Sequence, residues 1–389
     1  MDWQLECSDC GAQATAEGHP TVCTACGRPL LVRYPGREHP LTQRAEIRRG
    51  RGMWRFRAFL PLSPHEEPIT LGEGDTPMLA VPRLAASLGL GDIWVKDEGA
   101  NPTGSFKSRG LSAAITRAVH AGIDRYVIPT AGNAGVASAA YCARAGARVR
   151  VFAPRTTPRT ILAQIVAYGG DLQLLDGHIG DCGKAAKAYA AESGAMDLST
   201  LREPYRIEGK KTLGLEIAMQ FDWALPDVII YPTGGGTGLI GMWKAFVELR
   251  EAGWVTSPMP RLYTVQSTGC APIVQAFTTG QRQAEPWPDP WTIASGLRVP
   301  GPLGDRLMLR ILRETGGGAV AVSDESMQEL AQLGTRQEGV DFSPEGGASI
   351  AAAVELGRQG ALLAGQRVVL FNTGAGWLYR DPEQLLTAG

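Results

Sequence analysis

Lys107 lies in a segment whose residue types suit covalent chemistry on a carbonyl group. Residues 101–110 begin with turn-forming residues, continue with Gly and Ser, and lead into the helix-compatible run 111–119. A lysine in the first helical turn faces the positive end of the helix dipole, which disfavours an ammonium ion and favours a neutral amine or imine. Burial among Pro, Phe and Gly acts in the same direction. The segment therefore predicts Schiff-base formation at Lys107, and a surface lysine near a helix start is the equally weighted alternative.

Two glycine-rich turns each follow a short apolar run and precede a helix-compatible run, at residues 130–135 and 233–238. Consecutive backbone N–H groups at a helix N-terminus form an anion cradle, so we expect the second turn to bind a phosphate. It lacks the Gly-Lys-Ser/Thr of a nucleoside-triphosphate loop and the spacing of a dinucleotide-binding motif. Tight helix–strand packing is the alternative for a single turn. The expected cradle residues are Gly234, Gly235, Gly236, Thr237 and Gly238.

Thr373 follows the apolar run 368–371. In open α/β sheets, sites form at the carboxyl ends of the strands, so this hydroxyl stands where a ligand would be bound. A helix cap is the alternative.

Four cysteines near the N-terminus form two Cys-x-x-Cys pairs, Cys7/Cys10 and Cys23/Cys26, with 12 residues between the pairs. A glycine after each pair permits two sharp turns, and four thiolates can then surround a Zn²⁺ ion. Four protein ligands leave no open position, so the zinc would be structural. Reduced or redox-active pairs are the alternative. We expect His19, between the pairs, to be an exposed loop residue.

The composition excludes several classes of protein. The chain has 389 residues, with 38 Lys plus Arg against 39 Asp plus Glu, a formal net charge of −1. This balance argues against a broad basic surface for nucleic acid or anionic lipid. No apolar run approaches the roughly 18 residues of a membrane helix, and residues 1–6 lack the apolar core of a secretory signal. We therefore expect a cytoplasmic protein that binds neither nucleic acid nor membranes. The basic, aromatic segment 36–65 is interpreted as a packed connector, with a nucleic-acid contact as the alternative.

From about residue 70, short β-branched runs alternate with helix-compatible segments. Several runs are continuously apolar, as expected of strands buried on both faces of a parallel sheet. The pattern predicts an α/β fold. The expected strands are 93–95, 126–128, 149–152, 172–175, 228–231, 262–265, 320–322 and 368–371.

The order of these motifs resembles a known family. They read NPTGSFK at 101–107, TAGN at 130–133, RIEGKKT at 206–212, GGGTG at 234–238, PEGGA at 344–348 and NTG at 372–374. The set is similar to the pyridoxal-phosphate enzymes of the tryptophan-synthase-β fold type (fold type II), and within them to the threonine synthases. The N-terminal cysteine pairs, residues 53–57 and residues 71–77 are also similar to threonine synthases.

The resemblance implies two open twisted α/β domains with pyridoxal phosphate between them, plus a small N-terminal zinc ribbon. We expect the ribbon at residues 1–35, the large domain at 36–96 and 201–389, and the small domain at 97–200. It also implies roles for single residues. Lys107 would carry the cofactor and shuttle protons, Asn133 would contact the ring hydroxyl, and Thr373 would face the pyridine nitrogen. The cofactor phosphate would lie on residues 234–238.

The resemblance further implies a substrate site. Thr130, Ala131 and Gly132 would hold the substrate carboxylate, and Arg206 matches a family position for the substrate phosphate. Arg109 is a second candidate, and a structural ion pair is the alternative for each arginine.

The implied reaction is that of threonine synthase, from O-phosphohomoserine and water to threonine and phosphate. Ser108 stands where the family usually has an acid, and Ala131 where it commonly has a serine. These departures leave two other reactions open, a serine/threonine dehydratase-like elimination and a replacement on phosphoserine as in cysteate synthases. A non-catalytic zinc-ribbon binding protein is a third alternative. We expect an amino-acid phosphate as the partner molecule and a homodimer as the assembly.

Overall fold

The computed structural model describes residues 2–380, and it divides into two compact units. Unit 1 comprises Met1–Asp75, Lys107–Glu216 and Ile240–Trp254, and unit 2 comprises Thr76–Phe106, Ile217–Leu239 and Val255–Gly389. The chain therefore passes between the units several times. The domain boundaries expected from the sequence stay a prediction.

Unit 1 begins with a three-stranded antiparallel sheet in the order β2-β1-β3. The strands are β1 (Gln4–Cys7), β2 (Gln13–Ala14) and β3 (Leu30–Arg33). Burial alternates along β1, as expected of a sheet with one covered face.

The loop between the cysteine pairs packs on the start of helix α7 (Tyr205–Gln220). The ring centroid of His19 lies 5.0 Å from that of Tyr205, and Trp3 Nε1 donates to the Tyr205 hydroxyl at 3.5 Å. The expectation that His19 is exposed is wrong, because its ring is half-buried there. Burial, aided by the nearby charge of Arg117, lowers the pKa of His19 to about 4.

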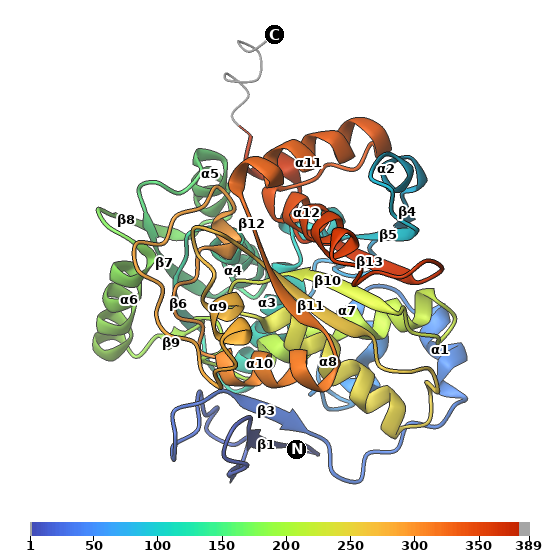
Figure 1. Ribbon diagram of the computed structural model, residues 1–389. Coiled ribbons are helices and arrows are strands. Elements are labelled where there is room, and N and C mark those ends of the chain that lie inside the picture. Colours follow the sequence, from blue (N-terminus) through green and yellow to red (C-terminus); the bar gives the residue numbers. More distant parts are fainter. Residues whose placement is uncertain (1, 381–389) are drawn as a thin grey trace. The chain divides into compact units, whose positions relative to one another are not determined.

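Unit 1 also contains a four-stranded parallel sheet, in the order β8-β7-β6-β9. Helices α4 (Asn133–Arg144) and α6 (Ile179–Ser193) cover opposite faces, as Figure 1 shows. Val151 meets α4, since it lies 3.2 Å from the position of a Cβ at Gly135, whereas the next residue, Phe152, packs on Tyr189 of α6. The strands are β6 (Arg125–Pro129), β7 (Arg148–Pro154), β8 (Asp171–Leu175) and β9 (Met196–Asp197).

Helix α3 (Lys107–His120) is almost wholly buried and packs on both α4 and α7. A Cβ at Gly209 of α7 would lie 2.0 Å from the carbonyl oxygen of Arg109, so the two backbones meet without a side chain between them. This close approach fixes α7 against the turn that begins at Lys107. The other long helices of this unit are α5 (Arg159–Ala167) and α8 (Thr237–Glu251), whose first three residues belong to unit 2.

The basic segment 36–65 is a packed connector, as interpreted from the sequence. It forms α1 (Gln43–Arg49) and a 3₁₀ segment η1 (Met53–Phe59), and Met53, Phe56 and Phe59 are fully buried.

Unit 2 contains a six-stranded sheet in the order β12-β11-β10-β13-β5-β4. All neighbours are parallel except the edge strand β4, which runs antiparallel to β5. Helix α12 (Pro344–Arg358) packs on β13, β10, β11 and β12, with α11 (Asp324–Glu338) stacked on α12 and α2 (Pro82–Ser87) beside α11 (Figure 1). The strands are β4 (Met78–Ala80), β5 (Asp92–Asp97), β10 (Val228–Pro232), β11 (Arg261–Ser267), β12 (Gly318–Val322) and β13 (Arg367–Asn372).

The helices of unit 2 are α2 (Pro82–Ser87), α9 (Pro272–Thr278), α10 (Asp305–Glu314), α11 (Asp324–Glu338) and α12 (Pro344–Arg358). Short 3₁₀ turns are η2 (Glu98–Ala100), η3 (Pro102–Gly104), η4 (Ser295–Leu297) and η5 (Gly376–Leu378). All eight strands expected from the sequence are present. Within residues 2–380, no helix combines the length and apolar character needed to cross a membrane.

Candidate active site

Lys107 is the first residue of helix α3, as the turn residues before it predicted. The two preceding residues are held at the end of β13. Ser105 forms a bridge with Gly374, and the N–H of Phe106 donates to the carbonyl of Thr373 at 3.0 Å. Because Lys107 directly follows Phe106, this hydrogen bond also fixes the position of the Lys107 backbone. Lys107 lies at the positive end of the dipole of a 14-residue helix.

Thr373 and the second glycine-rich turn lie at the same edge of the six-stranded sheet. Thr373 directly follows β13, and the turn directly follows β10. These two strands are parallel neighbours, with Ile230 opposite Leu370. Parallel neighbours end on the same side of a sheet, so the hydroxyl, the glycine-rich backbone and residues 105–106 come together there.

On one side of the turn at residues 233–238, the glycines allow other parts of the chain to pack closely against the backbone. A Cβ at Gly236, where φ is +80°, would lie 2.0 Å from Met308 Sδ, and one at Gly234 would lie 2.2 Å from the carbonyl of Gly296. Close packing is therefore one role of these two residues, although their neighbours belong to η4 and α10 and not to the helix–strand pair considered as the alternative. It does not exhaust their role, because the N–H groups of residues 234–236 make no hydrogen bond to protein within residues 2–380. The N–H groups of the first turn of α8 follow directly in the sequence. Several backbone N–H donors without an intrahelical partner therefore lie together at this turn.

Tyr231, in β10, adds a buried hydroxyl beside this loop. The hydroxyl oxygen lies 2.0 Å from the position that a Cβ of Gly238 would take, and it has no hydrogen-bond partner among the described residues. Burial raises the pKa of the phenol well above its ordinary value, so the hydroxyl keeps its proton. A protonated hydroxyl without a partner is a donor available to an anion.

The first glycine-rich turn lies in unit 1, between β6 and α4. The Thr130 hydroxyl accepts from the N–H groups of Gly132 and Gly135, at 3.1 and 3.2 Å, and so shapes the start of α4. Asn133 is the first residue of α4 and is nine-tenths buried, and Ala131 is buried beside it. The turn thus presents its backbone at the carboxyl edge of the four-stranded sheet.

Arg206 reaches the same edge of the four-stranded sheet. Its Nη1 donates to the carbonyl of Leu198 at 2.6 Å, and Leu198 follows β9, the parallel neighbour of β6. The residue is 1% exposed, yet Nε and Nη2 have no hydrogen-bond partner among the described residues. Buried guanidinium donors are costly to leave unpaired, and an anion bound here would satisfy both.

Arg109 has a different environment. Its Nη1 lies 3.0 Å from Glu216 Oε2 and 3.2 Å from the Thr212 hydroxyl, and both charged side chains are fully buried. This contact is the structural ion pair considered as the alternative for Arg109.

Glu203 caps helix α7 from a buried position. Its carboxylate accepts from the N–H of Tyr205 at 2.8 Å and from the N–H of Arg206 at 3.0 Å. These bonds and the charge of Arg206 favour the ionised form, but burial dominates and raises the pKa of Glu203 from 4.5 to about 7.

Glu203 should therefore make stability depend on pH. A carboxyl whose pKa is raised in the folded state holds its proton more tightly than in the unfolded chain, so stability falls as pH rises from about 4.5 to about 7. The shift corresponds to a loss of about 3 kcal/mol across that window. Glu203→Gln, which keeps one acceptor, should remove most of it, as read from urea unfolding midpoints at about pH 5 and about pH 8. Equal pH dependence in the two proteins would contradict this assignment.

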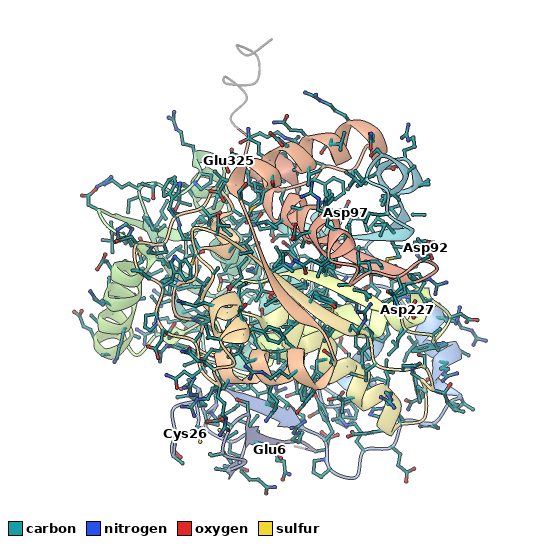
Figure 2. All side chains as sticks on the ribbon, viewed as in Figure 1. Glu6, Cys26, Asp92, Asp97, Asp227 and Glu325 are labelled. Carbon is teal, nitrogen blue, oxygen red and sulfur yellow. The ribbon has the colours of Figure 1, made fainter. Side chains whose placement is uncertain are left out.

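The four N-terminal cysteines gather their sulfurs at the tip of the three-stranded sheet, where Figure 2 labels Cys26. Cys26 Sγ lies 3.4 Å from Cys7 Sγ and 3.6 Å from Cys10 Sγ, and Cys10 Sγ lies 3.7 Å from Cys23 Sγ. Ligands at about 2.3 Å from a tetrahedral zinc are about 3.8 Å apart, so this cluster is nearly preformed. The backbone N–H of Cys26 is the main cause that lowers the pKa of the Cys23 thiol to about 7, whereas burial and the three neighbouring thiols raise the pKa of Cys26 to about 12. The cluster therefore favours a thiolate at Cys23 and a thiol at Cys26.

Residues 69–374 match the protein family described as pyridoxal-phosphate dependent enzyme. The match spans Lys107, both glycine-rich turns, Arg206 and Thr373. The chain belongs to this family of pyridoxal-phosphate-dependent enzymes. The fold type and the enzyme class expected from the sequence, a pyridoxal-phosphate-dependent lyase of fold type II, are confirmed.

Relatives of this enzyme cover most of its length. The threonine synthase of Methanocaldococcus jannaschii is 32% identical over 385 residues, which are 98% of this chain and 94% of that protein. The threonine synthase of Mycobacterium tuberculosis (strain ATCC 25618 / H37Rv) is 34% identical over 332 residues, which are 85% of this chain and 89% of that protein.

Solved structures share the fold of the enzyme. Maize serine racemase superposes with a TM-score of 0.70 at 23% identity and covers 80% of this chain and 91% of its own. The processed form of threonine deaminase isoform 2 from Solanum lycopersicum gives a TM-score of 0.66 at 21% identity, covering 80% and 86%.

The residues present fit pyridoxal phosphate. The cofactor carries an aldehyde, which needs an amine, and a phosphate, which needs several donors. The backbone of Lys107 is tied to the edge that holds the unpartnered N–H groups of residues 234–236, and the Tyr231 hydroxyl adds a further donor there. Tyr231 was not recognised from the sequence, because a tyrosine within an apolar strand is indistinguishable from a core residue.

Two supporting contacts at the six-stranded sheet were also not anticipated. Glu345 Oε1 accepts from the N–H of Gly296 at 2.8 Å, and the Gly296 carbonyl oxygen would lie 2.2 Å from a Cβ at Gly234 in the second glycine-rich turn. Asn372 Nδ2 donates to Asp97 Oδ1 at 2.9 Å, which fixes the end of β13 next to Thr373. The motifs at residues 344–348 and 372–374 contained Glu345 and Asn372, but spacing alone gave them no partner.

Proposed function

We propose that the enzyme is a threonine synthase, which converts O-phosphohomoserine and water to L-threonine and phosphate. The names of its relatives at 31–34% identity support this reaction. The structural observation that carries it is the pair of unpartnered, buried donors on Arg206, because only a substrate with a second anionic group beyond its carboxylate requires them. A hydroxyamino acid such as threonine has no second anionic group that these guanidinium donors could bind.

The reaction replaces a phosphate ester on one carbon by a hydroxyl, taken from water, on the neighbouring carbon. Phosphate leaves Cγ, water adds at Cβ, and protons must be removed from carbon and returned to it. When bound, pyridoxal phosphate supplies the electron sink that makes the protons on the substrate carbons acidic. Lys107 would hold the cofactor through its amine and then move these protons. The hydroxyl of Thr373 would face the pyridine nitrogen, where it cannot donate a full proton as a carboxylic acid could.

The other residues would bind and orient the substrate. The backbone of residues 130–132 would hold its carboxylate, with Asn133 at the cofactor ring hydroxyl. Arg206 would bind the phosphate and stabilise the charge that grows on it as it leaves. We also propose that Cys7, Cys10, Cys23 and Cys26 bind a structural Zn²⁺ ion, and that the enzyme acts as a homodimer.

The proposed reaction can be tested directly with three substrates. Purified holoenzyme should release phosphate and form threonine from O-phosphohomoserine. It should not deaminate L-threonine, and it should not replace the phosphate of O-phosphoserine with sulfite. Deamination of threonine with O-phosphohomoserine untouched would establish the dehydratase-like alternative instead. Turnover of phosphoserine with sulfite would establish the replacement alternative.

Arg206→Gln should lower kcat/KM for O-phosphohomoserine by about 10²-fold, since it removes a charged donor pair from a buried anion site. Arg202→Gln is the matched control, because Arg202 lies four residues earlier and its side chain is exposed. Steady-state phosphate release measures both variants. Equal kcat/KM for Arg206→Gln and the parent enzyme would show that Arg206 does not bind the phosphate.

A further inference from the structure

Residues 69–73 lie along one face of helix α3. Three buried hydroxyl residues of α3, spaced four apart, lie on that face, since residues four apart on a helix are neighbours on its surface. They are Ser108, Ser112 and Thr116. The N–H of Ile69 donates to the Thr116 hydroxyl at 2.9 Å, and the Ser112 hydroxyl donates to the Ile69 carbonyl at 2.7 Å. The two later hydroxyls therefore bind the backbone of this segment directly.

Glu73, at the end of the same segment, is a fully buried carboxylate. Its Oε1 accepts from Trp54 Nε1 at 3.0 Å, and its Oε2 accepts from the N–H of Leu71 at 3.0 Å and from the Thr70 hydroxyl at 3.2 Å. The shortest of its hydrogen bonds, 2.6 Å, comes from the hydroxyl of Tyr141 on α4. Both oxygens are thus occupied by donors, as a buried carboxylate requires.

Tyr141 connects this carboxylate to the first turn of α3. Burial, together with the charge of Glu73, raises the pKa of Tyr141 well above its ordinary value, so the hydroxyl keeps its proton and donates it to Glu73. The Tyr141 oxygen remains free to accept, and the Ser108 side chain hydrogen-bonds to it, which acts on the pKa in the opposite direction. The Ser108–Tyr141–Glu73 link therefore ends at the residue directly after Lys107.

The charge of Glu73 exceeds what docking of residues 69–73 on α3 requires. A neutral acceptor is enough for that purpose, as the Ile69 carbonyl shows. A buried charge costs free energy unless its surroundings favour it. The first turn of a helix favours a negative charge, because its backbone N–H groups lack intrahelical partners and the dipole is positive there. The link brings Glu73 within two hydrogen bonds of the turn that carries Lys107.

We propose that Glu73 and Tyr141 are positioning residues for Lys107, which act through Ser108 to hold the first turn of α3 in the orientation in which the lysine amine joins the cofactor. The hydrogen bond of Phe106 fixes the residue before Lys107, and the Ser108–Tyr141–Glu73 link fixes the residue after it. The inference rests on Lys107 being the amine that joins the cofactor, and not on the identity of the substrate.

The test uses two small changes at the link. Tyr141→Phe keeps the ring and removes the hydroxyl, and Ser108→Ala removes the other end. Each should raise the dissociation constant for pyridoxal phosphate about tenfold, by absorbance titration, and lower the circular dichroism of the cofactor band in the saturated holoenzyme. A residue that only stabilises the fold would not change that dichroism. Tyr126→Phe is the matched control, since the Tyr126 hydroxyl donates to the Ile123 carbonyl at 2.7 Å, and it should leave both quantities unchanged.

The double variant Ser108→Ala/Tyr141→Phe tests whether the residues act as one unit. Its affinity for the cofactor should equal that of Tyr141→Phe alone, because the link is already broken. Effects that multiply to about 100-fold would overturn the proposal, as would unchanged affinity and dichroism in the single variants. If Tyr141→Phe does not fold, Ser108→Ala decides the question by the same two measurements.

Borohydride labelling of the parent holoenzyme separates this inference from the assignment on which it rests. A label on Lys107 together with unchanged variants would refute the positioning role alone. A label on a different lysine would overturn both the assignment of Lys107 and the proposal.

Discussion

Lys107→Ala should reduce turnover of O-phosphohomoserine by about 10³-fold or more, because it removes both the amine that would hold the cofactor and the group that would move the protons. The variant should also lose the visible absorbance that the cofactor acquires when it is joined to an enzyme amine. Steady-state phosphate release and an absorbance spectrum measure the two effects. The paired loss matters, since a merely structural lysine would not change the spectrum.

Lys187→Ala is a suitable control for this variant, because Lys187 is an exposed lysine on α6. It should retain both turnover and spectrum. Full activity in Lys107→Ala would exclude the role that its position at the end of β13 and the start of α3 suggests. Retention of the cofactor spectrum together with loss of turnover would mean that another amine holds the cofactor.

Cys23→Ser should abolish stoichiometric zinc binding and unfold the three-stranded sheet, because the ion supplies about 10–16 kcal/mol of folding free energy in small zinc domains. The three strands hold only ten residues, five of them buried, to replace that contribution. Metal analysis and the protease sensitivity of residues 1–35 measure the effect. Because Trp3 and His19 pack on Tyr205 at the start of α7, the residue before Arg206, phosphate affinity should also fall.

Cys182→Ala provides the contrast, since Cys182 is buried in α6 outside the cluster and burial raises the pKa of its thiol to about 11. That variant should keep one zinc per chain. An equal zinc content in Cys23→Ser and the parent protein would show that the four sulfurs do not bind the metal, despite separations of 3.4–3.7 Å between several of them.

Much of the fold follows from local pattern. Strands such as β10 and β13 are continuously apolar because both faces of the sheet are covered, and this signature is visible in the sequence. The edge strand β4 was not recognised, because it has three residues and its pairing with β5 depends on contacts far along the chain. The course of the chain between the two units is likewise a tertiary property.

The local conformation at Lys107 and residues 233–238 was predicted correctly, because the signals lie within one segment, and the chemical roles of these residues stay a prediction. Residues were missed where their significance depends on a partner from another element. Tyr231 gains significance only from Gly238 beside its hydroxyl. The prediction for His19 was wrong for the same reason, because no residue near it in the sequence indicates that it contacts the ring of Tyr205.

The account depends most on Lys107 being the amine that joins the cofactor. Borohydride reduction of the holoenzyme, followed by digestion and mass spectrometry, tests this directly. We predict a single peptide that contains Lys107 and carries the reduced pyridoxyl phosphate group. A tag on any other lysine, or no tag on a protein that binds the cofactor, would contradict the assignment.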